Sequence, residues 1–310
     1  MAAITAAMVK ELREMTGAGM MDCKKALGET DGNMDEAVEY LRKNGQAKAE
    51  KKAGRIAAEG LCAVLVDGSD AAIVEVNSET DFVAKNADFK EFVEAVAKQA
   101  INSSSADIDA FLGEAWHLDG GKTVKDALTD KVAVIGENLS IRRFCHIKAE
   151  NGFIVSYVHA GGRIGVLVSV KSDKDDEAIR EAANNIAMQI AALNPKYVSQ
   201  KDVEQSYIEH EKEIIRAQIE NDPKEAAKPD KVKEGMIMGR INKEMKEICL
   251  LDQVYVKAED GKQSVAKYLE QVGKAAGADV SINSFVRFET GEGIEKKNEN
   301  FAEEVAKQIG

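Results

Sequence analysis

Apolar residues near the start of the chain recur at the spacing of short amphipathic helices. Positions three residues apart follow a helix cap at Thr5, and the segment Gly17-Ala18-Gly19 ends this first helix. We expect Asp22 to cap a second short helix and Asn33 to begin a third, which Gly45 should end. The pattern predicts a small bundle of three helices, followed by a polar connector.

The rest of the chain contains a repeated pattern that is typical of β-hairpins. Residues 60–77 and 152–171 each hold a β-rich run, a glycine-containing turn and a second β-rich run. A helix with Ala-rich apolar spacing follows each hairpin, and similar third strands close the two copies, LSIRRF at 139–144 and VSINSF at 280–285. We therefore predict two copies of hairpin, helix and strand, each a small antiparallel sheet covered by helices.

The two copies differ in length at one place. Val74 matches Val168 at an offset of 94 residues, whereas Gln99 matches Gln189 at an offset of 90. The first copy therefore holds four extra residues between its second strand and its helix, within residues 78–86. Because functional residues concentrate in loops on rigid frames, this insertion is a candidate functional segment.

A second helical segment, residues 203–248, interrupts the second copy before its last strand. Apolar positions at helical spacing lie on both sides of a break that contains Pro223 and Pro229. The pattern predicts a projecting arm made of two antiparallel helices. Two interpretations of its apolar stripe stay open at this point: it joins the two helices of the arm to each other, or it forms a dimer contact.

Length and composition favour a soluble globular protein of about two domains. The chain has 310 residues, 44% hydrophobic and 31% charged. Its net charge of −12 disfavours direct nucleic-acid binding, which needs clustered Lys and Arg. No apolar run reaches the roughly 18 residues of a membrane helix, and the N-terminus lacks a signal-peptide pattern. We expect a cytoplasmic protein with no membrane contact.

Residues that could carry catalytic or metal chemistry are scattered. The four cysteines form no C-x-x-C pair and are expected to be buried free thiols. The segment GGKT at 120–123 resembles the end of a phosphate-binding loop, but Trp116 occupies the position of its first glycine. We expect Trp116 to be a packing residue, and Gly161-Gly162 to form a turn. The sequence predicts no catalytic residue, no metal site and no cofactor.

Two apolar features are placed unusually for core residues. Met20 and Met21 are expected in the loop between the first two helices, where they form an adaptable contact surface or fill a gap between helices. Phe82 lies in the inserted segment. It is either a packing residue at the start of a helix capped by Asp81, or a surface contact.

Several of these segments resemble one known family. The segment TDFVAK at 80–85 is similar to a signature of bacterial translation elongation factor Ts. Residues 12–27, LREMTGAGMMDCKKAL, resemble the other hallmark of that family, near its N-terminus. Shorter matches occur at IGEN (135–138), at GVLV (165–168), and at Phe288 with GEGIEK (291–296). The resemblance covers nearly the whole chain, although residues 102–130 contain no family motif.

The resemblance implies a guanine-nucleotide exchange factor for the GTPase elongation factor Tu, which makes and breaks no bond. It also implies an α+β fold with a ubiquitin-associated-like bundle, two related subdomains, a coiled-coil arm and a C-terminal helical module. On this sequence the expected modules are residues 1–54 (bundle), 55–150 (first subdomain), 151–202 with 249–290 (second subdomain), 203–248 (arm) and 291–310 (C-terminal module).

The resemblance also assigns roles to particular residues. The wedge that is implied to lie against the partner's helices near its magnesium site consists of Thr80, Asp81, Phe82 and Val83. Contacts to the partner's nucleotide domain are implied for Arg13, Met20 and Met21. His159 is implied to contact the partner's more distant domains, although its turn, His-Ala-Gly-Gly-Arg, is one residue longer than the family pattern.

Two functional hypotheses follow from the sequence. The first is nucleotide exchange, in which the chain binds the GDP-bound GTPase, perturbs its magnesium and phosphate site, releases GDP and is displaced by GTP. The alternative is a non-catalytic scaffolding protein that only brings partners together. Acceleration of GDP release separates the two. The sequence leaves open a homodimer through the arm or a heterotetramer with the GTPase.

Overall fold

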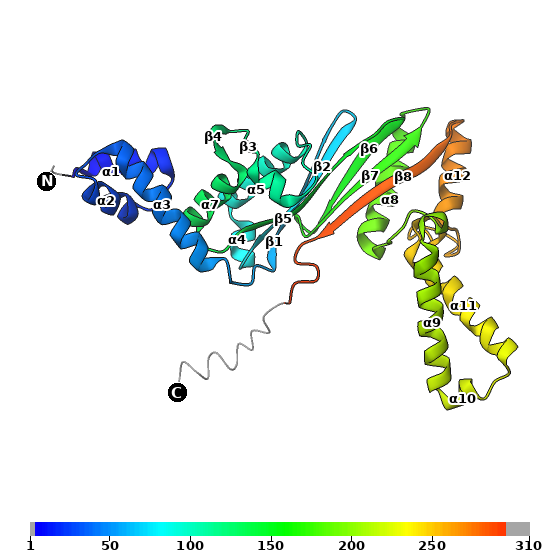
Figure 1. The fold of residues 1–310 in the computed structure, drawn as a ribbon. Helices are drawn as coiled ribbons and strands as arrows, with labels where there is room; N and C mark the ends of the chain where they lie inside the picture. The colour runs from blue at the N-terminus through cyan, green and yellow to red at the C-terminus, as the bar shows by residue number, and fades with distance from the viewer. Residues whose placement is uncertain (1–3, 296–310) are drawn as a thin grey trace.

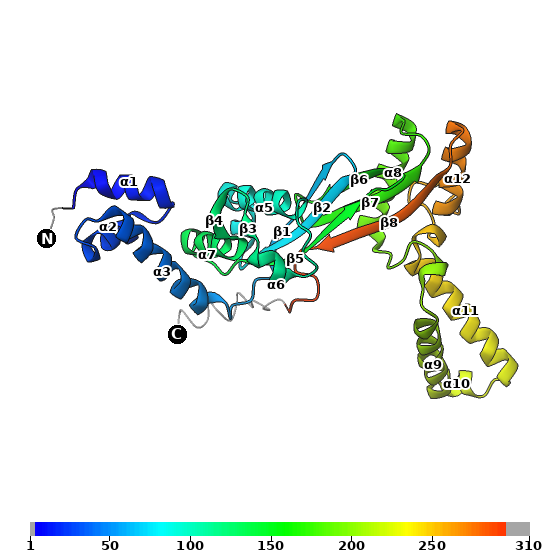
Figure 2. The ribbon, with the colours of Figure 1, turned by 45° about the horizontal axis from the view of Figure 1, so that its top comes forward.

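The computed structural model describes residues 4–295 and shows an α+β protein (Figure 1). Helices form its N-terminal end, two three-stranded antiparallel sheets lie in the centre, and a helical arm projects at the opposite end (Figures 1 and 2). Residues 296–310, most of the expected C-terminal module, lie outside the described residues. Within the described span no helix has both the length and the apolar character needed to cross a bilayer.

The N-terminal helices are α1 (Ala6–Thr16), α2 (Met20–Glu29) and α3 (Met34–Lys52). The predicted caps at Thr5 and Asn33 are confirmed, because each side chain accepts a hydrogen bond from the first turn of its helix. Gly17 ends α1 in the left-handed region with φ 69°, as predicted. A small core holds the three helices together: Val9, Leu12, Cys23, Ala26, Leu27 and Ala37.

The predicted end of the third helix is wrong. α3 runs through Gly45 to Lys52 and packs along α7 (Val124–Ile135). A Cβ atom at Gly45 would lie only 3.3 Å from the Cβ of Ala133, so the missing side chain permits the two helices to approach closely. Arg42 forms an ion pair with Asp126 of α7 at 3.3 Å. The bundle is therefore docked on the sheet-containing body through α3.

The predicted start of the second helix is also displaced. Gly19 is the N-cap of α2. Asp22 lies inside the first turn, where the positive end of the helix dipole stabilises its carboxylate. Met20 and Met21 are consequently the first two residues of α2 and do not lie in a loop. The error is one of boundary position, which depends on backbone geometry more than on residue type.

The two predicted hairpins and their third strands are confirmed. In the first sheet, strand β2 (Asp70–Ser78) lies between β1 (Glu59–Asp67) and β5 (Ser140–Lys148), all antiparallel. The second sheet has the same arrangement, with β7 between its neighbours: β6 (Gly152–His159), β7 (Ile164–Ser172) and β8 (Val280–Glu289). Residues in the intervening segments form helices that cover the outer faces of the sheets.

The two sheets pack on each other as well as on helices, so the body has four layers. Alternate residues of β1 and β2 face α5 (Ala87–Ala100), and those between them face the second sheet. On the other side, the second sheet packs against α8 (Glu177–Leu193). The core between the sheets contains Cys62, Ala71, Ile73, Ala149, Ile154, Leu167 and Phe288.

The covering helices carry a matching buried glutamine. Gln99 of α5 accepts a hydrogen bond from the backbone N–H of His117 at 2.9 Å, and its amide nitrogen donates to the carbonyl of Ala115. Gln189 of α8 binds Val256 N–H and Val254 C=O in the same way. In each sheet-and-helix unit, one buried amide side chain thus hydrogen-bonds a backbone N–H and a backbone C=O of a segment that lies next to its helix.

Glu75 joins the first sheet to the chain that leaves the second. Its side chain is fully buried and pairs with Arg142 at 3.0 Å and Arg143 at 2.5 Å. The same carboxylate accepts a hydrogen bond from the backbone N–H of Gly291 at 2.8 Å, two residues after β8 ends. Because a buried carboxylate must be paired and hydrogen-bonded, this cluster fixes the end of β8 on the first sheet.

The helical arm is confirmed. It consists of α9 (Gln205–Asn221), a short turn of helix α10 (Pro223–Ala226) and α11 (Asp230–Ile248). The apolar stripe lies between its own two helices, where Ile215, Ile219, Ile237, Ile241 and Met245 are buried. α12 (Val265–Ala276) then returns the chain to β8.

The segment between α5 and β5 contains three further short elements. α6 (Ile108–Gly113) is followed by a two-stranded hairpin, β3 (Ala115–Trp116) and β4 (Asp119–Thr123). Trp116 is buried in the core under α5, as predicted. GGKT lies on β4, and Lys122 pairs with Asp130 at 2.8 Å, so these residues do not form a phosphate-binding loop before a helix.

Replacement of Glu75 tests the joint between the sheets. We expect Glu75→Ala to lower the free energy of unfolding by about 3 kcal/mol, the low end for a broken buried pair, because the two arginines are about 30% exposed and can rehydrate in part. Urea denaturation measures the change. Glu91→Ala, on the exposed side of α5, is the control. Equal stability of the two variants would contradict this role for Glu75.

Candidate functional site

The inserted segment forms a short helix, α4 (Asp81–Lys85), between β2 and α5. Thr80 is its N-cap, and the Thr80 hydroxyl accepts a hydrogen bond from the backbone N–H of Val83 at 3.3 Å. Val83 and Ala84 pack toward the core under α5. The caps of α4 and α5 follow each other closely, since Asn86 accepts a hydrogen bond from Asp88 N–H. Both ends of α4 are thus fixed.

Phe82 points away from this anchored face. Its side chain is 81% exposed, whereas Phe89, one helix later, is fully buried. The interpretation of Phe82 as a packing residue is therefore wrong. A large apolar side chain held in water on a fixed helix is unfavourable for the isolated protein and is typical of a contact surface for another protein.

Asp81 does not cap the helix, because Thr80 already occupies the N-cap position. The Asp81 carboxylate forms an ion pair with Lys85 at 2.6 Å, one turn further along α4. The hydrogen bond from Lys85 lowers the pKa of Asp81 below its ordinary value. The carboxylate therefore stays ionised beside Phe82, at the positive N-terminal end of α4.

A second exposed apolar surface lies at the corner where α1 ends and α2 begins. The exposed fractions are 59% for Met15, 56% for Met20 and 76% for Met21. Arg13 is exposed in the last turn of α1. Cys23, below this corner, is buried, and burial raises the pKa of its thiol. Met20 and Met21 do not fill a gap between helices.

His159 ends β6 and is exposed at the hairpin turn. Its Nδ1 lies 2.9 Å from the hydroxyl of Tyr157. The turn itself is held against the first sheet, because Gly162 C=O accepts a hydrogen bond from Cys62 N–H at 2.6 Å. At Gly162 φ is 106°, a backbone conformation that residues with a side chain rarely adopt, and a Cβ atom there would lie 2.7 Å from Cδ2 of Leu61. The expected turn at Gly161-Gly162 is confirmed.

The structure brings two of the three predicted contact regions to one end of the first sheet. The turn after His159 contacts the start of β1, and Glu59 at that start pairs with Ser78, which leads directly to Thr80. The α1–α2 corner with Met20 and Met21 lies apart, in the N-terminal helices (Figure 1). A partner that contacts all three regions must therefore span the bundle and the body.

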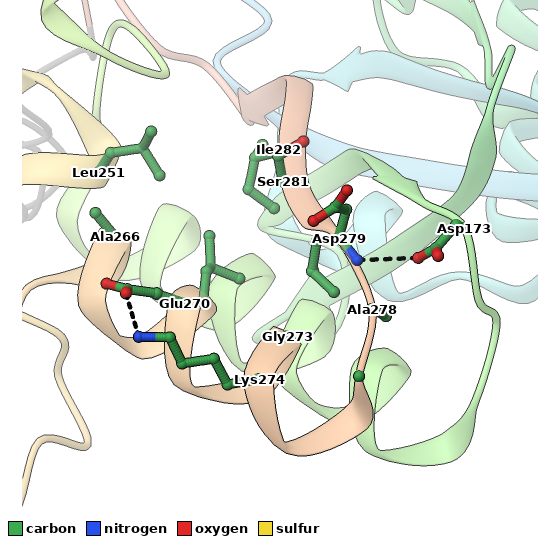
Figure 3. A pocket seen from close by; sticks show the side chains of 13 residues that line it. Asp173, Leu251, Ala266, Glu270, Gly273, Lys274, Ala278, Asp279, Ser281 and Ile282 are labelled. Atoms are coloured by element: carbon green, nitrogen blue, oxygen red, sulfur yellow. Dashed lines mark hydrogen bonds and ion pairs between the residues drawn. The ribbon is translucent and has the colours of Figure 1, made fainter.

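A pocket between α12 and the start of β8 lies away from α4 (Figures 1 and 3). Three of its charged side chains already have partners: Lys274 pairs with Glu270, and Asp173 accepts a hydrogen bond from Asp279 N–H. None of the predicted site residues lines it. Among residues 4–295, no group of three or more His, Cys, Asp or Glu is arranged to hold a metal ion.

The cysteines are free, as expected, although only three are buried. Cys23, Cys62 and Cys249 are buried, and Cys145 is half-buried. Burial raises the pKa of Cys62 and of Cys249 to about 11, which keeps these thiols protonated at neutral pH. They contribute to packing.

Sequence reasoning missed the acidic residues that hold the Thr80 segment. Glu137 accepts hydrogen bonds from this segment, and Glu79 accepts one from Asn138 N–H at 2.6 Å. The signal was the family-like segment at 135–138, but its sequence alone does not reveal which residues it contacts. Contacts between residues about 58 positions apart depend on how α7 packs under the first sheet.

Exposed apolar side chains on anchored elements define a protein that works by binding another protein. The sequence profile described as "Elongation factor TS" matches residues 79–292, more than half of the chain. "Elongation factor Ts" of Clostridium botulinum (strain Eklund 17B / Type B) is 52% identical over 309 residues, 99% of each chain. "Elongation factor Ts" of Clostridioides difficile (strain 630) is 51% identical over 311 residues, 100% of each chain.

The chain belongs to the elongation factor Ts family, which confirms the resemblance. Proteins of this family are nucleotide exchange factors for elongation factor Tu in translation elongation, and they are not catalytic enzymes. The exchange hypothesis is therefore confirmed at the level of the family.

Two phenylalanines provide a matched test of the exposed site. Phe82→Ala should leave the melting temperature nearly unchanged, because the ring is 81% exposed and has little packing to lose. Phe89→Ala should lower the free energy of unfolding by about 3–5 kcal/mol, as for a buried Phe. Thermal and urea denaturation measure both. Comparable losses in the two variants would show that Phe82 is a core residue.

Proposed function

We propose that this chain releases GDP from elongation factor Tu by inserting Phe82, with Asp81, beside the partner's magnesium and phosphate site. The observation that carries the proposal is an apolar ring exposed on a helix whose other face is anchored. Thr80 and Val83 hold the backbone of this wedge through the cap of α4. The wedge enters as a formed structure, so little ordering cost opposes its insertion.

The wedge acts through the sensitivity of bound magnesium to geometry. Mg²⁺ requires near-ideal octahedral coordination, so a small displacement of the groups that coordinate it sharply weakens its binding. Loss of the cation removes the main countercharge of the diphosphate. An ionised Asp81 beside the ring adds negative charge near the same region, which disfavours GDP further.

One wedge does not supply enough free energy. Burial of a Phe side chain contributes about 1.5–3 kcal/mol, whereas a ~10⁴-fold acceleration requires about 5.5 kcal/mol. Other contacts must therefore contribute. We propose that Arg13, Met20 and Met21 hold the partner's nucleotide domain, and that His159 contacts a more distant domain. Adaptable, exposed methionines suit the first role.

We propose the modular division expected from the sequence: a ubiquitin-associated-like bundle (1–54), two related subdomains (55–150, and 151–202 with 249–290), an arm (203–248) and a C-terminal module (291–310). The equal strand order of the two sheets and the matching pair Gln99 and Gln189 support a relation between the subdomains.

The apolar stripe between α9 and α11 supports an arm that closes on itself. A homodimer through the arm and a heterotetramer with the GTPase are the alternatives to be tested. The family supports a cytoplasmic location.

Release of fluorescent GDP from purified elongation factor Tu tests the proposal. The wild-type chain in catalytic amounts should accelerate release, and Phe82→Ala should lower the rate at saturating chain by about 10–100-fold, the equivalent of one buried Phe. Met21→Ala should instead raise the half-saturating concentration, since an anchoring contact is formed in all complexes.

Two outcomes would overturn the proposal. Binding of the wild-type chain without acceleration would support the scaffolding alternative. A saturating rate unchanged by Phe82→Ala, in a folded variant, would exclude Phe82 as the wedge.

A further inference from the structure

Glu137 lies two residues after α7, beyond the left-handed Gly136 that ends this helix. Its carboxylate faces the segment that leads into α4. One carboxylate oxygen, Oε2, accepts hydrogen bonds from the backbone N–H groups of Glu79 at 3.1 Å and Thr80 at 3.0 Å. The other oxygen, Oε1, accepts from the Thr80 hydroxyl at 2.7 Å. A single side chain thus receives three donors from two successive residues.

These donors need a partner because the sheet ends just before them. Ser78 is the last residue of β2 to pair with β1, so the N–H groups of Glu79 and Thr80 lie beyond the ladder. The Thr80 hydroxyl donates its proton to Glu137, and its oxygen accepts the N–H of Val83. Glu137 therefore fixes the rotation of the hydroxyl that caps α4.

The segments around Glu79 and Glu137 bind each other in both directions. While Glu137 binds the backbone at Glu79 and Thr80, the carboxylate of Glu79 accepts the backbone N–H of Asn138 at 2.6 Å and pairs with Arg55 at 3.3 Å. Each segment thus holds the other through charge-assisted hydrogen bonds, which are about twice as strong as neutral ones. The start of α4 is locked to the end of α7, the helix on which α3 of the N-terminal bundle is docked.

We propose that Glu137 is the positioning residue of the Phe82 wedge, an inference that rests on the proposed function. Phe82 has almost no packing of its own, so its direction depends on the first turn of α4 and on the cap that Glu137 orients. A loosened cap lets the ring sample other directions, and the wedge must then be ordered as GDP leaves. An ordering cost that arises only as GDP leaves lowers the maximal rate of release and leaves the affinity of the initial complex largely unchanged.

The variant Glu137→Gln tests the proposal, because an amide nitrogen cannot accept the hydrogen bonds that one carboxylate oxygen receives. We expect the rate of GDP release at saturating chain to fall about tenfold, the value of one charge-assisted hydrogen bond. The half-saturating concentration should stay within about twofold, since an indirect effect leaves the binding contacts in place. Glu94→Gln, the same charge change on the exposed side of α5, should exchange at the wild-type rate.

Combination with Phe82→Ala separates this inference from the proposed function. If Glu137 acts through the ring, Glu137→Gln in the Phe82→Ala background should cause no further decrease. A further tenfold decrease there, a wild-type saturating rate for Glu137→Gln, or a change in half-saturating concentration alone would overturn the positioning role. If Phe82→Ala itself exchanges normally, the proposed wedge fails first, and the positioning role fails with it.

A second pair of variants covers loss of folding. Circular dichroism and thermal denaturation report whether Glu137→Gln is folded. If it is not, Thr80→Val removes only the hydroxyl between Glu137 and Val83, and Thr80→Ser retains it. Slower release by Thr80→Val than by Thr80→Ser supports the proposal. Equal rates for the two variants contradict it.

Discussion

The buried carboxylate of Glu75 is the constraint on which the central architecture depends. It lies between two packed sheets, and it binds two arginines of β5 together with the backbone where the chain leaves β8. A charge in this place is tolerated only while all its partners are present. The cluster consequently fixes one sheet on the other, and with them the end of the first sheet from which the Thr80 segment and the turn after His159 emerge.

At this end of the sheet, α4 holds the exposed Phe82 on a backbone that is fixed by packing and hydrogen bonds. Burial of Ala84, packing of the half-buried Val83, the cap at Thr80 and the hydrogen bonds of Glu79 and Glu137 all act on a helix of five residues. The isolated chain keeps Phe82 in water, which is unfavourable, and this free energy becomes available when a partner covers the ring. The same principle applies to Met20 and Met21, which open α2 on a docked bundle.

The local elements could be predicted from the sequence, because they follow from periodicity and capping over short distances. Both hairpins, the arm, and the caps at Thr5 and Asn33 are examples. The inserted segment around Phe82 was also located, through the unequal offsets of the two copies. What failed depended on tertiary packing: Gly45 looks like a helix end in sequence, yet it lies inside α3 because α7 approaches there. Thr80 and Asp81 are both good capping residues, and only the backbone decides between them.

Packing between the sheets, and therefore the role of Glu75, could not be predicted. The run AAIVEV in β2 is typical of a strand but does not reveal that its glutamate is buried, because burial on both faces follows from the packing of the second sheet. The contacts of Glu137 were hidden for the same reason, since its partners lie about 58 residues earlier in the chain. Family membership supplies the partner and the activity, and the geometry supplies a physical basis for each proposed contact.

As the proposed wedge, Phe82 binds the partner more strongly once GDP is absent. Because GDP and this chain must weaken each other's binding to elongation factor Tu by the same factor, equilibrium affinities report this preference. The measurement is the Kd of the wild-type and Phe82→Ala chains for elongation factor Tu, both nucleotide-free and saturated with GDP. We expect Phe82→Ala to weaken binding to the nucleotide-free partner more than binding to the GDP-bound one. The Kd for the GDP-bound partner divided by the Kd for the nucleotide-free partner should therefore be smaller for Phe82→Ala than for the wild-type chain. An unchanged ratio, with both affinities reduced equally, would contradict it.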